Sequence, residues 1–215
     1  MFSAGLGGVA GAVAAQVDID GSGASRHARE LAGKRAVTRD LADAVHLVCL
    51  LHGTAPGVLD HAKRTDPASG AGDWLSDAAT AFSAERALVA QLAAAAGPLP
   101  STPGQAESEA AVQAQRHALE MLARSDRMGC ALGAAVALVL DWPAVRSVLE
   151  SAATRFGLEP AAAVLPPPVE TLTLVAALGS PAPVERAMMF GAQQLLAQHR
   201  GLWALLDARA AARDH

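Results

Sequence analysis

Long stretches of this chain carry apolar residues at every third or fourth position, which is the spacing of one face of an α-helix. The longest runs from about Pro183 to Arg213, and its apolar face includes Met188, Leu195 and Leu202. Alanine, the strongest helix former, is the commonest residue. No stretch shows the apolar–polar alternation of a half-buried strand. We therefore expect an all-α protein, built as an up-down helical bundle.

Helix caps and breakers divide this pattern into segments. Helices are expected at about 25–36, 38–52, 73–96, 105–124, 170–178 and 183–213, with a short one around Asp60. A further helix over 128–140 is expected to break at Asp141-Trp142-Pro143, before another that ends near Phe156. The Gly- and Ala-rich residues 1–23 indicate a flexible arm, and residues 24–215 a single helical-bundle domain.

Several polar residues occupy positions where the helical spacing requires apolar ones. Burying a polar group without a partner costs about 1–3 kcal/mol, so each of these residues needs a partner in the core. Such a group either belongs to a structural hydrogen-bond network or lines a pocket for a ligand or a metal. The candidates for an inward pocket are Asp43, His46, His52, Glu85, Glu185 and His199.

The helix over 38–52 carries four of its polar residues at every third position: Asp43, His46, Cys49 and His52. Each step of three residues turns the side chain by about 60°, so neighbours can meet but all four cannot converge. This helix alone therefore cannot supply a metal site with three ligands. Asp43 is placed to accept a hydrogen bond from His46 and fix its tautomer.

Glu85 shares the apolar face of the helix over 73–96. A carboxylate in this position pairs with a buried cation, binds a metal or has a raised pKa. Its neighbour Arg86 points away from the apolar face, so a partner from another helix is required. His46 and His199 are the obvious candidates.

One short motif, Asp18-Ile-Asp20-Gly-Ser22-Gly23, matches the first half of a calcium-binding loop. Such a loop needs a bidentate Glu at position 12, where this chain has Arg29. A flexible Gly-Ser turn is the better interpretation.

Four long helices with carboxylates and histidines projecting inward resemble the ferritin-like superfamily, over about residues 38–213. Catalytic di-iron members of that superfamily carry Glu-x-x-His on two of the four helices. Here the third residue after Glu85, Glu120 and Glu185 is Leu, Ala and Met, respectively. The resemblance therefore implies a ferritin-like member without the di-iron centre.

The charge and the cysteines bear on partners and compartment. A net charge of −4 argues against nucleic-acid binding, which favours a basic surface. The densest basic segment contains Arg26, Arg29, Lys34, Arg35 and Arg39, and this pattern indicates a solvated helix face.

Cys49 and Cys130 lie in apolar helical stretches without a disulfide pattern, which favours a reducing, cytoplasmic location. The charge-free runs 1–16 and 128–140 are too short to span a membrane, which needs about 20 residues.

These observations favour a binding or interaction module with a small inward polar pocket, no expected cofactor and a tendency to form homodimers. The alternative is a non-standard metal-dependent oxidoreductase of ferritin-like type, with Glu85, Glu185, His199 and His46 as ligands. A third interpretation is an apolar-ligand binder with its cavity beside the methionines of the last helix.

Overall fold

The computed structural model describes residues 7–65 and 70–213, and within these residues the chain is helical and contains no strand. The elements are α1 (Gly8–Asp20), the 3₁₀ turn η1 (Ser22–Ala24), α2 (Arg26–Leu31), α3 (Thr38–His52), α4 (Val58–Thr65), α5 (Gly72–Ala96), α6 (Gln105–Ala123), α7 (Cys130–Phe156), α8 (Pro168–Ala177) and α9 (Ala182–Arg213). The expected helices at 73–96, 105–124 and 183–213 are confirmed to within one residue at each end.

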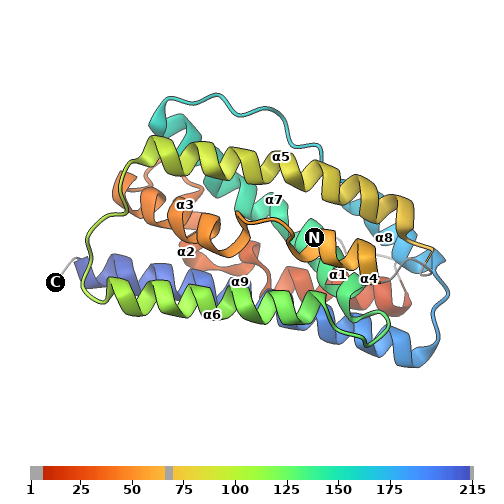
Figure 1. Cartoon of the computed structure of the whole chain (residues 1–215). Coiled ribbons are helices and arrows are strands. Elements are labelled where there is room, and N and C mark those ends of the chain that lie inside the picture. The colour runs from red at the N-terminus through yellow and green to blue at the C-terminus, as the bar shows by residue number, and fades with distance from the viewer. Residues whose placement is uncertain (1–6, 66–69, 214–215) are drawn as a thin grey trace.

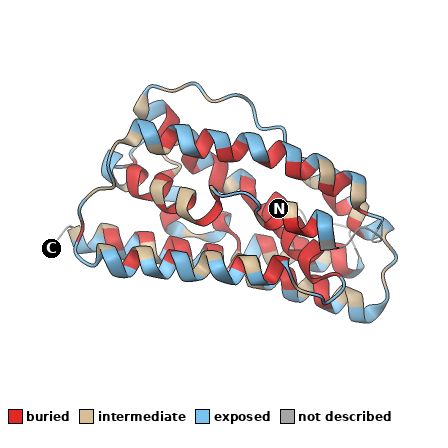
Figure 2. Ribbon diagram, viewed as in Figure 1, coloured by how far each residue is buried: buried red, intermediate tan, exposed pale blue. Residues whose placement is uncertain are grey.

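The core is organised around α7. Figure 1 shows α5 along one side of the molecule and α6 with α9 along the other, with α3 and α7 between them. Every residue from Cys130 to Trp142 is buried, and the buried faces of the surrounding helices turn inward (Figure 2). In the described chain α7 is the one helix long and apolar enough to cross a membrane, but 83% of its apolar window is buried by the other helices. In this structure α7 therefore serves as the central core helix.

The backbones of α7 and α9 lie in direct contact at two glycines, Gly133 and Gly191. A Cβ atom added at Gly133 would lie 2.0 Å from the carbonyl oxygen of Met188, and one at Gly191 would lie 2.0 Å from that of Cys130. Only a residue without a side chain permits this approach. Gly133 faces Met188, and farther along both helices Asp141 contacts His199, so α7 and α9 run in the same direction. In a strictly up-down bundle consecutive long helices run in opposite directions, so this pair departs from that arrangement; the connection through α8 makes it possible.

The expectation of a flexible arm over residues 1–23 is wrong for residues 7–23, and residues 1–6 lie outside the described part of the chain. Residues 8–20 form α1, which buries Val9, Val13 and Val17 against the core and packs beside α8 and α9. Asp18 and Asp20 are helical, so they do not belong to a calcium-binding loop. After α1, Ser25 caps α2 as expected, because its Oγ accepts the amide hydrogen of Ala28.

The expected break at Asp141-Trp142-Pro143 is also wrong, because α7 continues through Pro143 to Phe156. A proline inside a helix costs about 3 kcal/mol. The next turns bury Val145, Val148 and Leu149, and each such side chain contributes about 1.5–3 kcal/mol when fully buried. Burial therefore outweighs the cost of the proline. The unbroken helix carries Asp141 and Trp142 into the core instead of leaving them in a surface turn.

Candidate functional site

A chain of hydrogen bonds crosses the core from η1 to the end of α3. An oxygen of Asp141, Oδ2, lies 2.6 Å from Nδ1 of His199, and Nε2 of His199 lies 2.8 Å from Nε2 of His52. Asp141 also accepts the backbone N–H of Ser22 at 2.7 Å and its hydroxyl at 2.5 Å. Trp203 donates its indole N–H to the Ser22 hydroxyl at 2.8 Å. We call Ser22, Asp141, His199 and His52 the relay.

The geometry of the relay constrains its protons. Asp141 receives hydrogen bonds from three donors, which is the pattern of an ionised carboxylate. His199 therefore carries a hydrogen on Nδ1, facing Asp141. The 2.8 Å contact between the two Nε2 atoms then holds one proton, either on His52 or on His199. When the proton is on His199, that ring is a cation next to the carboxylate.

His52 is the member of the relay nearest the surface. Burial lowers the pKa of His52 well below its ordinary value, and it is lowered further by the charge of His199, when that ring is protonated, and by that of Arg86. The ring is held by edge-on contacts with Phe82 and Trp142, with ring centroids 6.2 and 5.6 Å away. His52 is therefore a fixed, neutral base at neutral pH. The relay bonds His52 through Nε2, so Nδ1 is the ring nitrogen that the relay does not use.

A small hollow begins at His52 and opens between α3, α4 and α6. Its volume is about 20 Å³, room for about one water molecule. The walls include His52, Phe82, Gly57 and Leu119, with Arg116 and Glu120 on α6. We call it the His52 hollow. A ligand can place one small polar group against His52 at this point.

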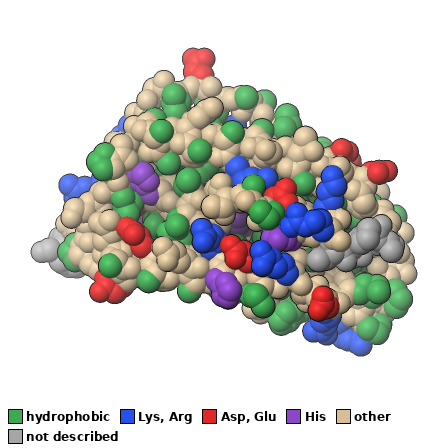
Figure 3. Space-filling view, in the orientation of Figure 1, with side chains coloured by type: hydrophobic (Ala, Val, Ile, Leu, Met, Phe, Trp, Pro, Cys, Tyr) green, Lys and Arg blue, Asp and Glu red, His purple; other side chains and the backbone are tan. Residues whose placement is uncertain are grey.

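Charged side chains gather on the surrounding face, as Figure 3 shows over α4 and α6. Arg86 is 9% exposed and lies 3.1 Å from Asp60, measured from Nη1 to Oδ2. The pKa of His61 is lowered by burial and by the positive charges of Arg64 and Arg124, although nearby carboxylates oppose the shift. Both His52 and His61 are therefore disfavoured as cations.

Glu85 lies in the core as expected, but its expected partners are wrong. Nη1 of Arg146 lies 2.5 Å from Oε1 of Glu85, and the indole N–H of Trp142 donates to Oε2 at 2.9 Å. Glu85 and Arg146 are 2% and 5% exposed, respectively. Neither His46 nor His199 takes part, since Nε2 of His46 lies 2.9 Å from the carbonyl oxygen of Gly97. This cluster joins α5 to α7 and is a buried ion pair.

Asp43 likewise has a different partner from the one expected. It accepts two hydrogen bonds of 3.1 Å from Arg209, and a third from Arg213. The expected bond with His46 is absent, because the three-residue step turns the two side chains toward different helices. Asp43 therefore fastens the end of α9 to α3.

The structure brings together only two of the six candidate residues, His52 and His199. Asp43, His46 and Glu85 each bond elsewhere, and Glu185 is half-buried in the first turn of α9. In the described chain no three His, Cys, Asp or Glu side chains are grouped so that they could hold a metal ion. Sequence reasoning missed Asp141 and Ser22. The signal that could have revealed Asp141 is its spacing of three and four residues from Leu138 and Val145.

The sequence was compared with known protein families, curated proteins and solved structures. A family model described as a family of unknown function, DUF6975, matches residues 17–214. The chain belongs to the DUF6975 family. No curated protein and no solved structure matches it. The DUF6975 match includes every residue of the relay and begins inside α1, so it covers residues 17–23 of the segment expected to be a flexible arm.

Proposed function

We propose that this DUF6975 protein binds a small molecule that places one polar group in the His52 hollow, and that His52 accepts a proton from that group. The observation that carries the proposal is the continuous hydrogen-bonded chain from Asp141 through His199 to His52, which ends at a surface hollow. The protein is then a binding module in which the bound ligand transfers a proton to His52.

Stability alone gives little reason for such a chain. Replacing buried ionic groups by apolar residues of similar size is often neutral or stabilising, because desolvation offsets much of the attraction. Asp141 and His199 are 2% and 1% exposed, so both are desolvated. A network with only a structural role also has no need to reach the surface, whereas a proton-transfer chain does.

The relay provides a path for the proton. We begin with His52 protonated on Nε2 and donating to neutral His199, so that Nδ1 of His52 carries a lone pair. When Nδ1 takes a proton from the ligand, the Nε2 proton passes to His199 across the 2.8 Å contact. The positive charge then lies on His199, 2.6 Å from the Asp141 carboxylate. The relay thus moves the charge away from the hollow to the place where it is best stabilised.

The test uses phenol and acetohydroxamic acid as weakly acidic probes, with anisole as a matched probe that has no proton to give. Binding is followed through the amide chemical shifts of Gly57 and Val58 beside the hollow. Saturable shifts are expected with an acidic probe but not with anisole. They should persist in His46→Phe, a half-buried histidine of the same helix, and disappear in His52→Phe. The proposal is wrong if neither acidic probe gives a saturable shift, or if His52→Phe binds as well as the unmodified protein.

For the architecture we propose a ferritin-like four-helix core formed by α3, α6, α7 and α9. Two observations support it: each of these helices packs against the other three, and the connection from α7 to α9 is long. Ferritin-like bundles contain one long crossover, and such a connection lets α7 and α9 run in the same direction. An experimental structure in which these four helices do not share one core would contradict the proposal.

We also propose that the protein forms a homodimer through an apolar area on α6 and α9. Met121 is 58% exposed and Phe190 43% exposed, and both line a surface hollow of about 350 Å³. Exposed apolar side chains that cluster are common at protein interfaces. Sedimentation velocity should show a dimer that Phe190→Glu dissociates, and a monomer at all concentrations would contradict this proposal.

A further inference from the structure

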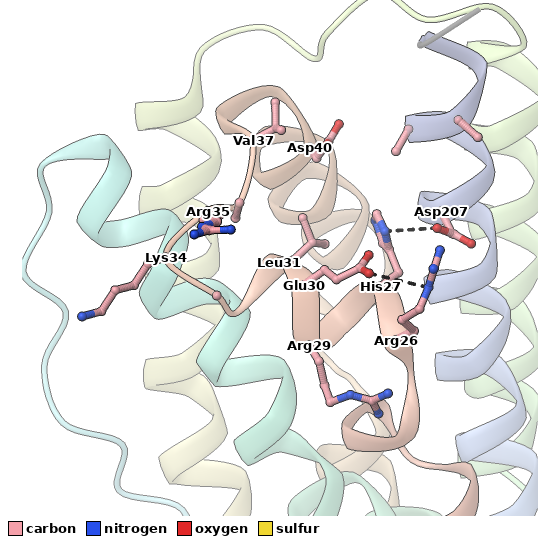
Figure 4. Close-up of a pocket in the computed structure, with 14 residues that line it drawn as sticks. Arg26, His27, Arg29, Glu30, Leu31, Lys34, Arg35, Val37, Asp40 and Asp207 are labelled. Carbon is pink, nitrogen blue, oxygen red and sulfur yellow. Dashed lines mark ion pairs between the residues drawn. The ribbon is translucent and has the colours of Figure 1, made fainter.

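Four exposed residues of the basic segment line a groove: Arg26, Arg29, Lys34 and Arg35 (Figure 4). The groove has a volume of about 670 Å³ and lies between α2, the turn that follows it, the start of α3 and the C-terminal part of α9. Pockets for small organic molecules have volumes of about 300–1,000 Å³. It is separate from the His52 hollow, and none of its lining residues belongs to the relay.

Several charged side chains around the groove have partners. Arg26 lies 3.6 Å from Glu30, and Nδ1 of His27 lies 3.3 Å from Asp207, as the dashed lines in Figure 4 mark. The third acidic residue in the lining, Asp40, pairs with an arginine at the end of α9. Each carboxylate of the lining therefore already has a partner.

Three cations of the lining remain without a carboxylate partner in the described structure. The guanidinium of Arg29 donates to the carbonyl oxygens of Gly23 and Ala24 at 2.8 and 2.7 Å, and these bonds leave its charge uncompensated. Lys34 and Arg35 are exposed in the turn after α2, and neither makes an ion pair. An excess of positive charge in one groove is unexpected in a chain whose net charge is −4.

The rest of the groove is partly apolar. Leu31, Val37, Ala210 and Ala211 contribute to its lining, and Val37 is 58% exposed. His27 also lines it, and Nε2 of this ring is buried without a hydrogen-bond partner among the described residues. The groove therefore combines an apolar floor with uncompensated cations.

We infer that this groove binds an organic anion, a molecule with an apolar body and a carboxylate or phosphate group. Arginine recognises both groups, because its planar guanidinium can donate two parallel hydrogen bonds to them. Arg35 lies in the middle of the basic turn and holds the anionic group, while Leu31 and Val37 contact the apolar body. Lys34 points away from α9 in Figure 4 and adds a longer-range attraction.

The experiment is calorimetric titration of the full chain with octanoate, monooctyl phosphate and octanol. These probes share one apolar body, so they separate a carboxylate ligand from a phosphate ligand and both from an uncharged one. The variant is Arg35→Glu. The matched control is Arg39→Glu, which makes the same charge change at an exposed residue four positions along, outside the groove lining.

At least one of the two anions should bind with one-to-one stoichiometry, and the tighter one identifies the anionic group. Arg35→Glu should weaken this binding by about tenfold or more, the effect of losing one charged hydrogen bond, and Arg39→Glu by much less. Added salt should weaken binding by the unmodified protein. The inference is overturned if neither anion binds, if octanol binds as tightly, or if the two variants weaken binding equally.

Discussion

Replacing Asp141 by Asn keeps the shape of the side chain but removes its charge and introduces a donor. The oxygen of the new amide can still accept the amide hydrogen of Ser22. Its NH₂ group then faces His199, which must change tautomer and accept on Nδ1. His199 now carries its hydrogen on Nε2 and donates it to His52, so His52 must hold its own hydrogen on Nδ1. The hydrogen bonds from residue 141 through His199 to His52 persist with their directions reversed, whereas the Ser22 hydroxyl, which donates to the same oxygen as His199, now faces the NH₂ group.

The cost of this reversal follows from the bonds that lose their charge. A hydrogen bond to a charged group contributes about 1.5–3 kcal/mol and a neutral one about 0.5–1.5 kcal/mol. Asp141 accepts three such bonds. Asp141→Asn should therefore lower the free energy of unfolding by about 3 kcal/mol. With a urea dependence of about 3 kcal/mol per molar, the midpoint falls by about 1 M.

Urea unfolding followed by circular dichroism measures this change. The matched control is Asp207→Asn, because Asp207 also pairs with a histidine but is 53% exposed at its side chain. This control should change the free energy of unfolding by about 0.5 kcal/mol or less. If Asp141→Asn costs no more than Asp207→Asn, Asp141 does not carry a buried charge and the relay is refuted. Because His52 becomes a donor on Nδ1 in this variant, Asp141→Asn should also abolish binding of weakly acidic probes.

Three further predictions concern stability. Glu85→Ala leaves the Arg146 charge buried and should cost about 3–5 kcal/mol in urea unfolding. The double variant Glu85→Leu/Arg146→Met removes both charges and should cost less, about 1–3 kcal/mol, because the Trp142 N–H loses its acceptor; equal losses would contradict the buried pair. Burial lowers the pKa of His52 in the folded state, so below a pH of about 6.5 the unfolded chain binds more protons than the folded one. The contribution of His52 to the free energy of unfolding should therefore be constant above that pH and fall below it, by up to about 1.4 kcal/mol per pH unit. His52→Phe should flatten this slope, and an unchanged slope would assign it to other groups. Gly133→Ala should lower the melting temperature, since its Cβ would lie 2.0 Å from a backbone oxygen of α9, while Gly72→Ala, with open space around it, should not.

The helices of this protein were largely predictable because their apolar spacing is regular. The two errors share a physical cause, which is that long-range burial overrides a local signal. Gly and Ala in residues 8–20 suggest a flexible segment, yet the valines of α1 are buried against α8 and α9. Pro143 is a local break signal, yet the side chains that follow it are buried deeply enough to keep α7 continuous.

The site was predictable only in part. His52 and His199 stand out as polar residues on apolar faces, and the structure joins them. Spacing gives the face on which a residue lies but not its partner on another helix. For this reason Glu85 was assigned the wrong partners. Asp141 went unnoticed because the error at Pro143 placed it in a surface turn, and Ser22 because the error at α1 placed it in a flexible arm.

The most direct test of the relay is NMR of the protein with ¹⁵N-labelled histidine, measuring scalar coupling between ring nitrogens across the hydrogen bond. The account predicts a coupling between Nε2 of His52 and Nε2 of His199, since the two atoms lie 2.8 Å apart and share one proton. It also predicts that the shared proton exchanges slowly with water, because both rings are buried. No coupling, together with fast exchange of the His52 ring hydrogen, would contradict the relay and the function proposed from it.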